Sequence, residues 1–166
     1  LSMYDDGEEF GYADLEQIDA YINVHLRGDD LGTIVAQGDI GQNELTGNSI
    51  SYDLGEKAVQ GINGTITFFE RKNGESLAVL ELVNTPEGGT HPAYIHPNPA
   101  AVGGGILFSF NPVDGTTGIS QTNVATFDDG GILEYFDIEL LDGHINVHLS
   151  ANELETIVAQ GNIGIN

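Results

Sequence analysis

Hydrophobic residues along this chain occur in short runs that are separated by clusters of glycine, asparagine and aspartate. The clearest pair of runs covers residues 64–72 and 75–83, and both runs are rich in β-branched and other apolar residues. Asn73 and Gly74 stand between them, and this dipeptide favours the tight turn of a two-stranded hairpin. The pattern therefore predicts an antiparallel β-hairpin over residues 64–83.

The rest of the chain continues this pattern of short strands and turns. We expect further strands at residues 48–53, 93–96, 105–110, 122–127, 132–138, 143–149 and 156–163. Helix is expected only as single turns near residues 14–18 and 152–156. The segment 85–105 contains four prolines and five glycines, so we expect it to be mostly loop. Short strands at regular spacing predict an all-β fold, either an antiparallel β-sandwich or a Greek-key barrel.

The chain also contains an internal repeat. The stretch Asp19-Ala-Tyr-Ile-Asn-Val-His-Leu26 returns, with two changes, as Asp142-Gly-His-Ile-Asn-Val-His-Leu149, at an offset of 123 residues. Without any gap, 22 of the 43 positions from Leu1 to Asn43 carry the same residue as their partners at 124–166. A repeat of 123 residues has the size of a domain, so we expect whole domains repeated in tandem.

This repeat predicts two parts of the chain. Residues 1–43 would be the C-terminal part of a preceding repeat, and residues 44–166 would be a complete domain. The strands expected between residues 20 and 40 would then lack the first part of their own domain and would leave sheet edges open. A partner chain could donate the missing strands, the domain boundaries could differ from those of the repeat, or the chain could be a fragment of a longer one. Donation of strands between copies would produce a polymer.

The chain is strongly acidic, with four Lys and Arg residues against 26 Asp and Glu residues and a net charge of −22. Such a charge repels a phosphate backbone, which excludes nucleic acid as a partner. Cysteine is absent, so disulfides and thiolate metal sites are excluded too. No apolar run approaches the ~20 residues that span a membrane. Residues 1–10 lack the features of a signal peptide, so we expect a mature or truncated N-terminus.

Two histidine motifs lie in the second half of the chain. His91-Pro-Ala-Tyr-Ile-His96 precedes a loop rich in proline and glycine, and Gly143-His-Ile-Asn-Val-His148 precedes a short polar loop and Ile157-Val-Ala-Gln-Gly161. In this order the motifs resemble those of the CHRD (chordin-repeat) family, over roughly residues 50–166 and again in the tail at 1–43. The resemblance implies an extracellular β-sandwich-like domain, often repeated in bacterial surface proteins, with no established catalytic activity. Where the family commonly has His, this chain has Tyr94.

The histidines form the first candidate site. On a strand over residues 143–149, His144 and His148 share one face while the apolar residues share the other. His91, His96 and His148, with His144 as a fourth ligand, could together bind copper or zinc. The alternative is structural, with His96 and His148 hydrogen-bonded to each other or to nearby backbone groups in a polar layer.

Carboxylates form the second candidate site. Pairs of aspartates stand in expected turns at Asp5-Asp6, Asp29-Asp30 and Asp128-Asp129. Their oxygens are the ligands that calcium prefers, although none of the pairs has the full spacing of an EF-hand loop. A turn-forming role is the alternative, because Asp and Gly are favoured in turns. Calcium, copper and zinc are therefore the candidate cofactors.

No catalytic motif stands out, so we do not expect an enzyme. There is no Gly-x-Ser-x-Gly elbow, and Gly103–Gly105 precedes an expected strand instead of the helix that a phosphate loop needs. We expect an extracellular or cell-surface module with a structural or adhesive role, whose partners are copies of itself and which could form a fibre by strand sharing. The alternative is a histidine-based copper or zinc binding domain. A carbohydrate-binding module with surface glycans as partners is a third hypothesis, although the chain has no Trp for a sugar platform.

Overall fold

The contacts of the chain divide it into two compact units. The computed structural model describes residue 3 and residues 5–166. The first unit contains the described residues up to Thr46 together with Arg71–Asn73, and the second contains Gly47–Glu70 and Gly74–Asn166. The assignment of residues 1–43 and 44–166 to successive repeats stays a prediction.

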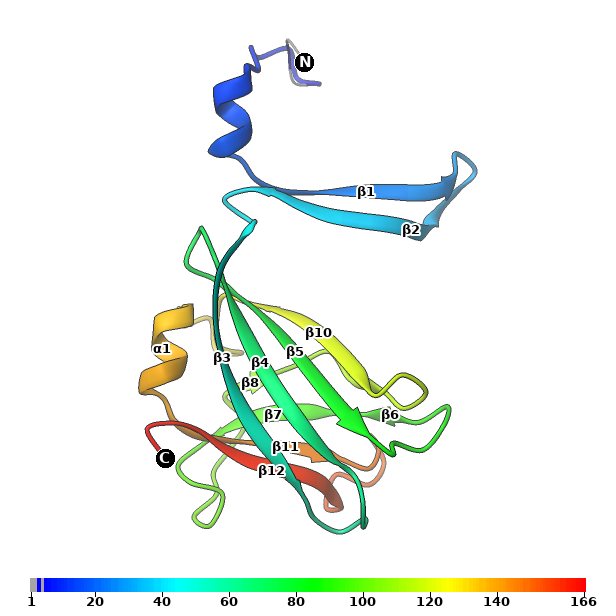
Figure 1. Cartoon of the computed structure of the whole chain (residues 1–166), viewed down its shortest axis with the longest axis vertical. Helices are drawn as coiled ribbons and strands as arrows, with labels where there is room; N and C mark the ends of the chain where they lie inside the picture. The colour runs from blue at the N-terminus through cyan, green and yellow to red at the C-terminus, as the bar shows by residue number, and fades with distance from the viewer. Residues whose placement is uncertain (1–2, 4) are drawn as a thin grey trace. The chain divides into compact units, whose positions relative to one another are not determined.

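The first unit consists of a short helix and a long β-hairpin (Figure 1). Its elements are the 3-10 helix η1 (Tyr12–Glu16) and the strands β1 (Asp19–Arg27) and β2 (Asp30–Gly41). The two strands pair antiparallel and form a sheet of their own, so neither outer edge has a neighbouring strand among the described residues. An isolated hairpin of this kind is marginally stable in water.

A partly buried ion pair joins Arg71 to Asp39 at the end of β2 within this unit. The side chain of Arg71 is only 6% exposed, and its Nη1 donates to Oδ2 of Asp39 at 2.7 Å and to the carbonyl of Asn43. The neighbouring pair of Lys72 and Glu44, at 2.6 Å, is about half exposed. Since a buried charge is costly when it is left alone, Arg71 stabilises the end of β2 more than Lys72 does.

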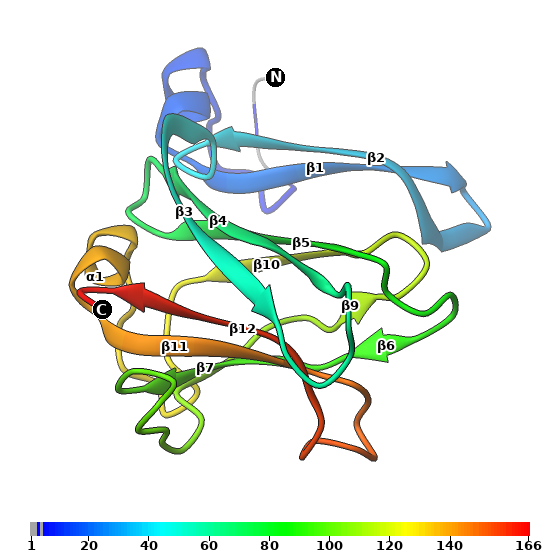
Figure 2. The same ribbon diagram turned by 60° about the horizontal axis from the view of Figure 1, so that its bottom comes forward.

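The second unit is an eight-stranded antiparallel sheet that curls on itself (Figures 1 and 2). Its strands, in sheet order, are β10 (Ile119–Val124), β5 (Ser76–Val83), β4 (Asn63–Arg71), β3 (Leu45–Glu56), β12 (Ile157–Gly164), β11 (Asp142–His148), β7 (Ala93–Pro97) and β8 (Phe108–Ser109). A separate two-stranded sheet joins β6 (Thr90–His91) and β9 (Val113–Asp114). The predicted all-β fold is confirmed, whereas tandem repetition of it stays a prediction.

The hydrophobic core lies inside the curl of this sheet. Alternate residues of β5, such as Ala78, Leu80 and Leu82, face it, which is the period expected of a strand with one buried face. The largest fully buried apolar side chains are Leu54, Ile62, Ile66, Phe68, Leu80, Ile95, Leu133, Ile138, Ile145 and Ile163. They come from strands on both sides of the curl, from the connection between β3 and β4 and from the segment between β10 and β11, so the whole unit shares one core.

The predicted hairpin over residues 64–83 is confirmed as β4 and β5, which pair from Asn63 with Val83 to Glu70 with Ser76. Gly74 in the turn has φ of +88°, a conformation that glycine adopts without strain. The strands expected at 48–53, 93–96, 143–149 and 156–163 are also present, as β3, β7, β11 and β12.

The strand expected at residues 132–138 is wrong, because helix α1 (Tyr135–Leu140) occupies part of that segment. The backbone amide of Glu134 donates to Oδ2 of Asp137 at 2.9 Å, and this capping contact starts the helix. The single helical turn expected at 152–156 is absent, since that segment forms turns. Among the described residues, none of the helices combines the length and the apolar character needed to cross a membrane.

Residues 3–41 and 126–164 share much of their local structure, although β2 begins at Asp30 whereas the residues equivalent to 30–33 form turns before β12. Met3 forms an isolated bridge with Glu9, as Thr126 does with Ile132, and the helices η1 and α1 begin at Tyr12 and Tyr135. From Asp19 with Gly41 to His25 with Ile34, every pair of β1 and β2 has its counterpart 123 residues later in β11 and β12. Both hairpins also have a register irregularity at the same place, at Val24/His25 and at Val147/His148.

Candidate functional site

Three of the four predicted histidines, His96, His144 and His148, lie on one face of β7 and β11, whereas His91 lies on β6. His96 stands opposite His144, and Tyr94 stands opposite Asn146, in the register of these antiparallel strands. His148 follows at the end of β11, on the same face as His144. His144 and His148 are 2% and 6% exposed, so this face of β11 is buried nearly as fully as the face that meets the core.

Each of the four predicted histidines holds a backbone carbonyl through its Nδ1 atom. Nδ1 of His144 lies 2.7 Å from the carbonyl oxygen of Asn98, and Nδ1 of His96 lies 3.1 Å from the carbonyl oxygens of both Gly104 and Gly105. Nδ1 of His148 contacts the carbonyl oxygen of Leu154. Nδ1 of His91 lies 3.2 Å from the backbone carbonyl oxygen of His148. Because a carbonyl only accepts, Nδ1 carries the proton in each contact and leaves Nε2 with a lone pair.

The Nε2 atoms of His91, His96 and His148 are buried and have no hydrogen-bond partner in the described part of the chain. Burial lowers the pKa of His148 below its ordinary value, the bond to Leu154 acts in the opposite direction, and nearby His96 lowers the pKa further. The pKa of His144 is lowered for the same reasons, with the carbonyl of Asn98 as the opposing partner. His144 and His148 are therefore held in the neutral form that can accept a hydrogen bond or bind a metal.

The rings of His144, His96, Tyr94 and His148 follow one another in a row, which we call the histidine row, and do not surround a single point. His144 stacks on His96 with ring centres 5.1 Å apart, Tyr94 meets His96 edge to face at 6.3 Å, and Tyr94 also contacts His148 at 5.4 Å. Tyr94 thus occupies the position next to both His96 and His148. Across the described part of the chain, no three His, Asp or Glu side chains are grouped to hold a metal ion.

Of the predicted aspartates in the first and third pairs along the chain, Asp6 and Asp129 accept hydrogen bonds within their own turns, whereas Asp128 binds Ser109 of β8. Oδ1 of Asp6 accepts from the amide of Glu8 at 3.1 Å, and Oδ1 of Asp129 accepts from the amide of Gly131 at 2.9 Å. Asp128 accepts from the amide and the hydroxyl of Ser109 at 3.0 and 2.7 Å, whereas Asp5 is exposed in its turn. The contacts of Asp6 and Asp129 match the turn-forming alternative.

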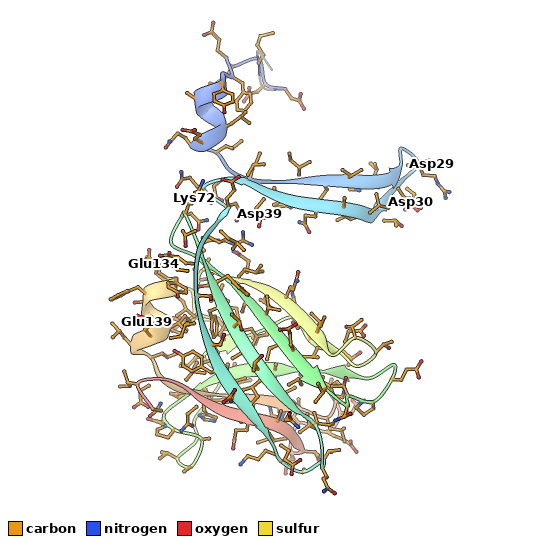
Figure 3. All side chains as sticks on the ribbon, viewed as in Figure 1. Asp29, Asp30, Asp39, Lys72, Glu134 and Glu139 are labelled. Carbon is orange, nitrogen blue, oxygen red and sulfur yellow. The ribbon has the colours of Figure 1, made fainter. Side chains whose placement is uncertain are left out.

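The remaining aspartate pair lies at the far turn of the β1–β2 hairpin, while Asp39 lies near its base (Figure 3). Asp29 pairs with Nε of Arg27 at 2.9 Å, and both side chains are largely exposed. Asp30 accepts from the amide and the hydroxyl of Thr33 at 3.2 and 3.0 Å. This pair therefore shapes its turn as Asp6 and Asp129 shape theirs.

The exposed apolar face of the β1–β2 hairpin is a second candidate site. Ile22, Val24 and Val35 are 53%, 51% and 54% exposed. Their partners in the repeat, Ile145, Val147 and Val158, are completely buried in the core of the second unit. Large apolar side chains gathered on one face mark an interaction surface. The sequence predicted open edges for these strands, but the exposed face became visible only in the structure.

The two hairpins also differ in how closely other atoms pack against their glycines. A Cβ atom at Gly161 of β12 would lie 2.0 Å from the carbonyl oxygen of Asp53 in β3, so only glycine fits there. Gly38 is the partner of Gly161 in the repeat, and no atom of the described residues beyond its chain neighbours lies within 4 Å of its Cβ position. By contrast Gly41 and Gly164 meet equivalent carbonyls, of Ile18 at 2.0 Å and of Leu141 at 1.8 Å. Both hairpins therefore have the same close backbone contact at their last glycine. Only β11–β12 has the close approach of the β3 backbone.

The chain matches no protein-family model, no curated protein and no solved structure. The resemblance to the CHRD family therefore rests on the two histidine motifs and stays a prediction.

Proposed function

We propose that this chain is an extracellular structural repeat module, in which copies of the repeat share strands and build an elongated array. One observation carries the proposal: the β1–β2 hairpin has the register of β11–β12, yet among the described residues it lacks the strands that flank β11–β12 on both sides. A hairpin with two open edges and an apolar face is incomplete as a folded unit. Strand addition from another copy would complete it.

The charge of the chain fits an extended array better than a compact aggregate. A net charge of −22 on 166 residues makes copies repel one another except where a specific interface is formed. Contact between copies is then confined to surfaces with apolar side chains and unpaired strand edges, which the β1–β2 hairpin offers. Exposed acidic residues elsewhere keep the array soluble.

Electron microscopy and light scattering of the purified chain over a range of concentrations test this proposal. Elongated or polymeric particles that lengthen with concentration are the expected result. Compact monomers at every concentration would overturn assembly between separate chains. A matched run with Ile22→Asp and Val24→Asp, which places charge on the exposed face, is expected to leave only monomers.

A copper- or zinc-binding role is the second candidate function, and the buried Nε2 atoms of His91, His96 and His148 favour it. A ring whose Nδ1 holds a carbonyl is oriented as metal-binding histidines usually are. Titration of the chelator-treated protein with Cu²⁺ or Zn²⁺ tests it, with near-stoichiometric uptake expected. Uptake that is unchanged in the His96→Ala, His148→Ala double variant would overturn the role of these histidines.

A further inference from the structure

We propose that the β1–β2 hairpin docks between the equivalents of β3 and β7 in another copy of the repeat, in the place that β11–β12 occupies within the second unit. This inference rests on the proposed function and names the partner of the hairpin. The second unit shows what surrounds such a hairpin: β7 pairs with the outer edge of β11, and β3 pairs with the outer edge of β12.

The edges of β1 and β2 are suited to the same neighbours. In the second unit Ile145 of β11 stands opposite Ile95 of β7, and both are completely buried. Because the registers of the two hairpins agree pair by pair, Ile22 takes the position of Ile145 and would stand opposite the residue equivalent to Ile95. Docking would thus bury the apolar face of the hairpin and pair both of its open edges.

Gly38 supports the same partner independently of the apolar face. In the second unit glycine is required at position 161 because the backbone of β3 passes at Asp53, 2.0 Å from the Cβ position. At Gly38 the equivalent space is open. Glycine in a strand interior marks a place where another backbone approaches closely, and here the approaching backbone would be the equivalent of β3.

The polar face of the hairpin is also incomplete. Oδ1 of Asn23 and Nδ1 of His25 are buried without a hydrogen-bond partner among the residues that the structure describes. The same atoms are satisfied at their partners in the repeat, since Asn146 accepts from Nε2 of Gln160 at 2.7 Å and Nδ1 of His148 holds the carbonyl of Leu154. Gln37 and Leu31 hold the positions of Gln160 and Leu154 in the repeat, so these two contacts are made in the packed hairpin and are missing in the open one.

The docking partner of the β1–β2 hairpin can be built into the same molecule by fusion. A second copy of residues 44–123 is fused to the N-terminus of the full chain, so that the added segment carries the equivalents of β3 and β7. Amide hydrogen exchange is then compared between the original and the extended chain. Amides of β1 and β2 are expected to exchange at least about 100-fold more slowly in the extended chain, approaching those of β11 and β12.

Three variants of the extended chain make the test specific. Ile22→Asp combined with Val24→Asp is expected to abolish the added protection, and Gly38→Ala is expected to reduce it because its methyl group would meet the crossing backbone. Leu31→Asp is the matched control, since Leu31 is 64% exposed and its partner Leu154 remains 43% exposed in the second unit. It should leave the added protection unchanged.

The outcomes separate this inference from the proposed function. Equal exchange of β1 and β2 in the original and extended chains would overturn docking at this place, even if microscopy showed elongated particles. Added protection that Ile22→Asp with Val24→Asp does not remove would overturn it as well. Added protection in a chain that forms only compact particles would support docking and contradict the array.

Discussion

Ile22 and Ile145 hold the same position in two hairpins of identical register, yet Ile145 is completely buried while Ile22 is 53% exposed. The difference has one physical cause. Ile145 lies between β7 and β12 over the core of the second unit, whereas the sheet around Ile22 has two strands in the described part of the chain. The same residue in the same local structure therefore stabilises the fold in one place and offers an interaction surface in the other.

This contrast predicts unequal costs for the same substitution. Ile145→Ala is expected to lower the free energy of unfolding of the second unit by about 2–5 kcal/mol, because it leaves a cavity in a packed core. Ile22→Ala should change stability by less than about 0.5 kcal/mol, as exposed substitutions usually do. Urea unfolding followed by circular dichroism measures both. Equal costs in the two variants would contradict the structural difference between the hairpins.

A methyl group at Gly161 should be more harmful than one at Gly38. Gly161→Ala would place a Cβ atom 2.0 Å from the carbonyl oxygen of Asp53, so β3 and β12 would have to separate. We expect a loss of stability of at least about 1–3 kcal/mol, the usual cost of overpacking. Gly38→Ala, which meets open space in the same chain, is the control and should be tolerated in thermal unfolding. If Gly161→Ala were tolerated, the backbone of β3 at Asp53 would not pack closely against Gly161 of β12.

Removal of the buried cation of the first unit should destabilise that unit. Arg71→Ala leaves Asp39 without this ion pair and is expected to cost about 3 kcal/mol. Lys72→Ala removes an exposed cation one residue away and should cost less than about 1 kcal/mol. Hydrogen exchange of β2 reports the loss. Similar exchange in both variants would show that Arg71 does not hold the end of β2.

Stability of the second unit should fall as the pH drops below about 6.5, the ordinary pKa of histidine. The pKa values of His144 and His148 are lowered in the folded state, so the unfolded chain binds more protons in this range. Stability from these groups is complete above the unfolded pKa and is lost as the pH falls toward the folded pKa. Urea unfolding between about pH 7.5 and 5.5 measures this slope. We expect a smaller slope in the His144→Gln, His148→Gln double variant, and an equal slope would contradict the assignment to these two rings.

Tyr94 should limit metal binding by the histidine row. Its ring contacts both His96 and His148, so it fills the place where a third imidazole would complete a ligand set. Tyr94→His is expected to bind Zn²⁺ or Cu²⁺ at least about 10-fold more tightly than the original chain, since three imidazoles suit either ion. Competition titration measures the affinity, and Tyr94→Phe, which keeps the ring without a ligand atom, is the control. Unchanged affinity in Tyr94→His would show that these positions do not form a metal site.

Local patterns in the sequence predicted the strands well where turn chemistry was explicit. Asn73 and Gly74 located the β4–β5 hairpin, and the alternation along β11 located that strand. The same reasoning was wrong at residues 132–138, where apolar residues suggested a strand. There the contact between the amide of Glu134 and Asp137 starts helix α1 instead, and Ile138 of that helix is fully buried in the core.

The histidine site shows a different limit of sequence reasoning. The motifs placed His96 and His148 near one another, and the pairing of β7 with β11 brings their strands together. Spacing along a strand says nothing about which ring atom faces a carbonyl, so the Nδ1 contacts and the unpartnered Nε2 atoms were not predictable. The position of Tyr94 beside both rings depends on the register between two strands that lie about 50 residues apart in the chain.

The local structure of both hairpins follows from sequence, because turns, alternation and the glycines at Gly41 and Gly164 act over a few residues. The identity of 22 in 43 positions accordingly yields the same bridge, helix start and strand register in both segments. Burial is different in kind, since it depends on which other strands lie beside a segment. β3, β7 and the core make β11–β12 part of a folded interior, and without such neighbours the same pattern leaves β1–β2 as an open surface.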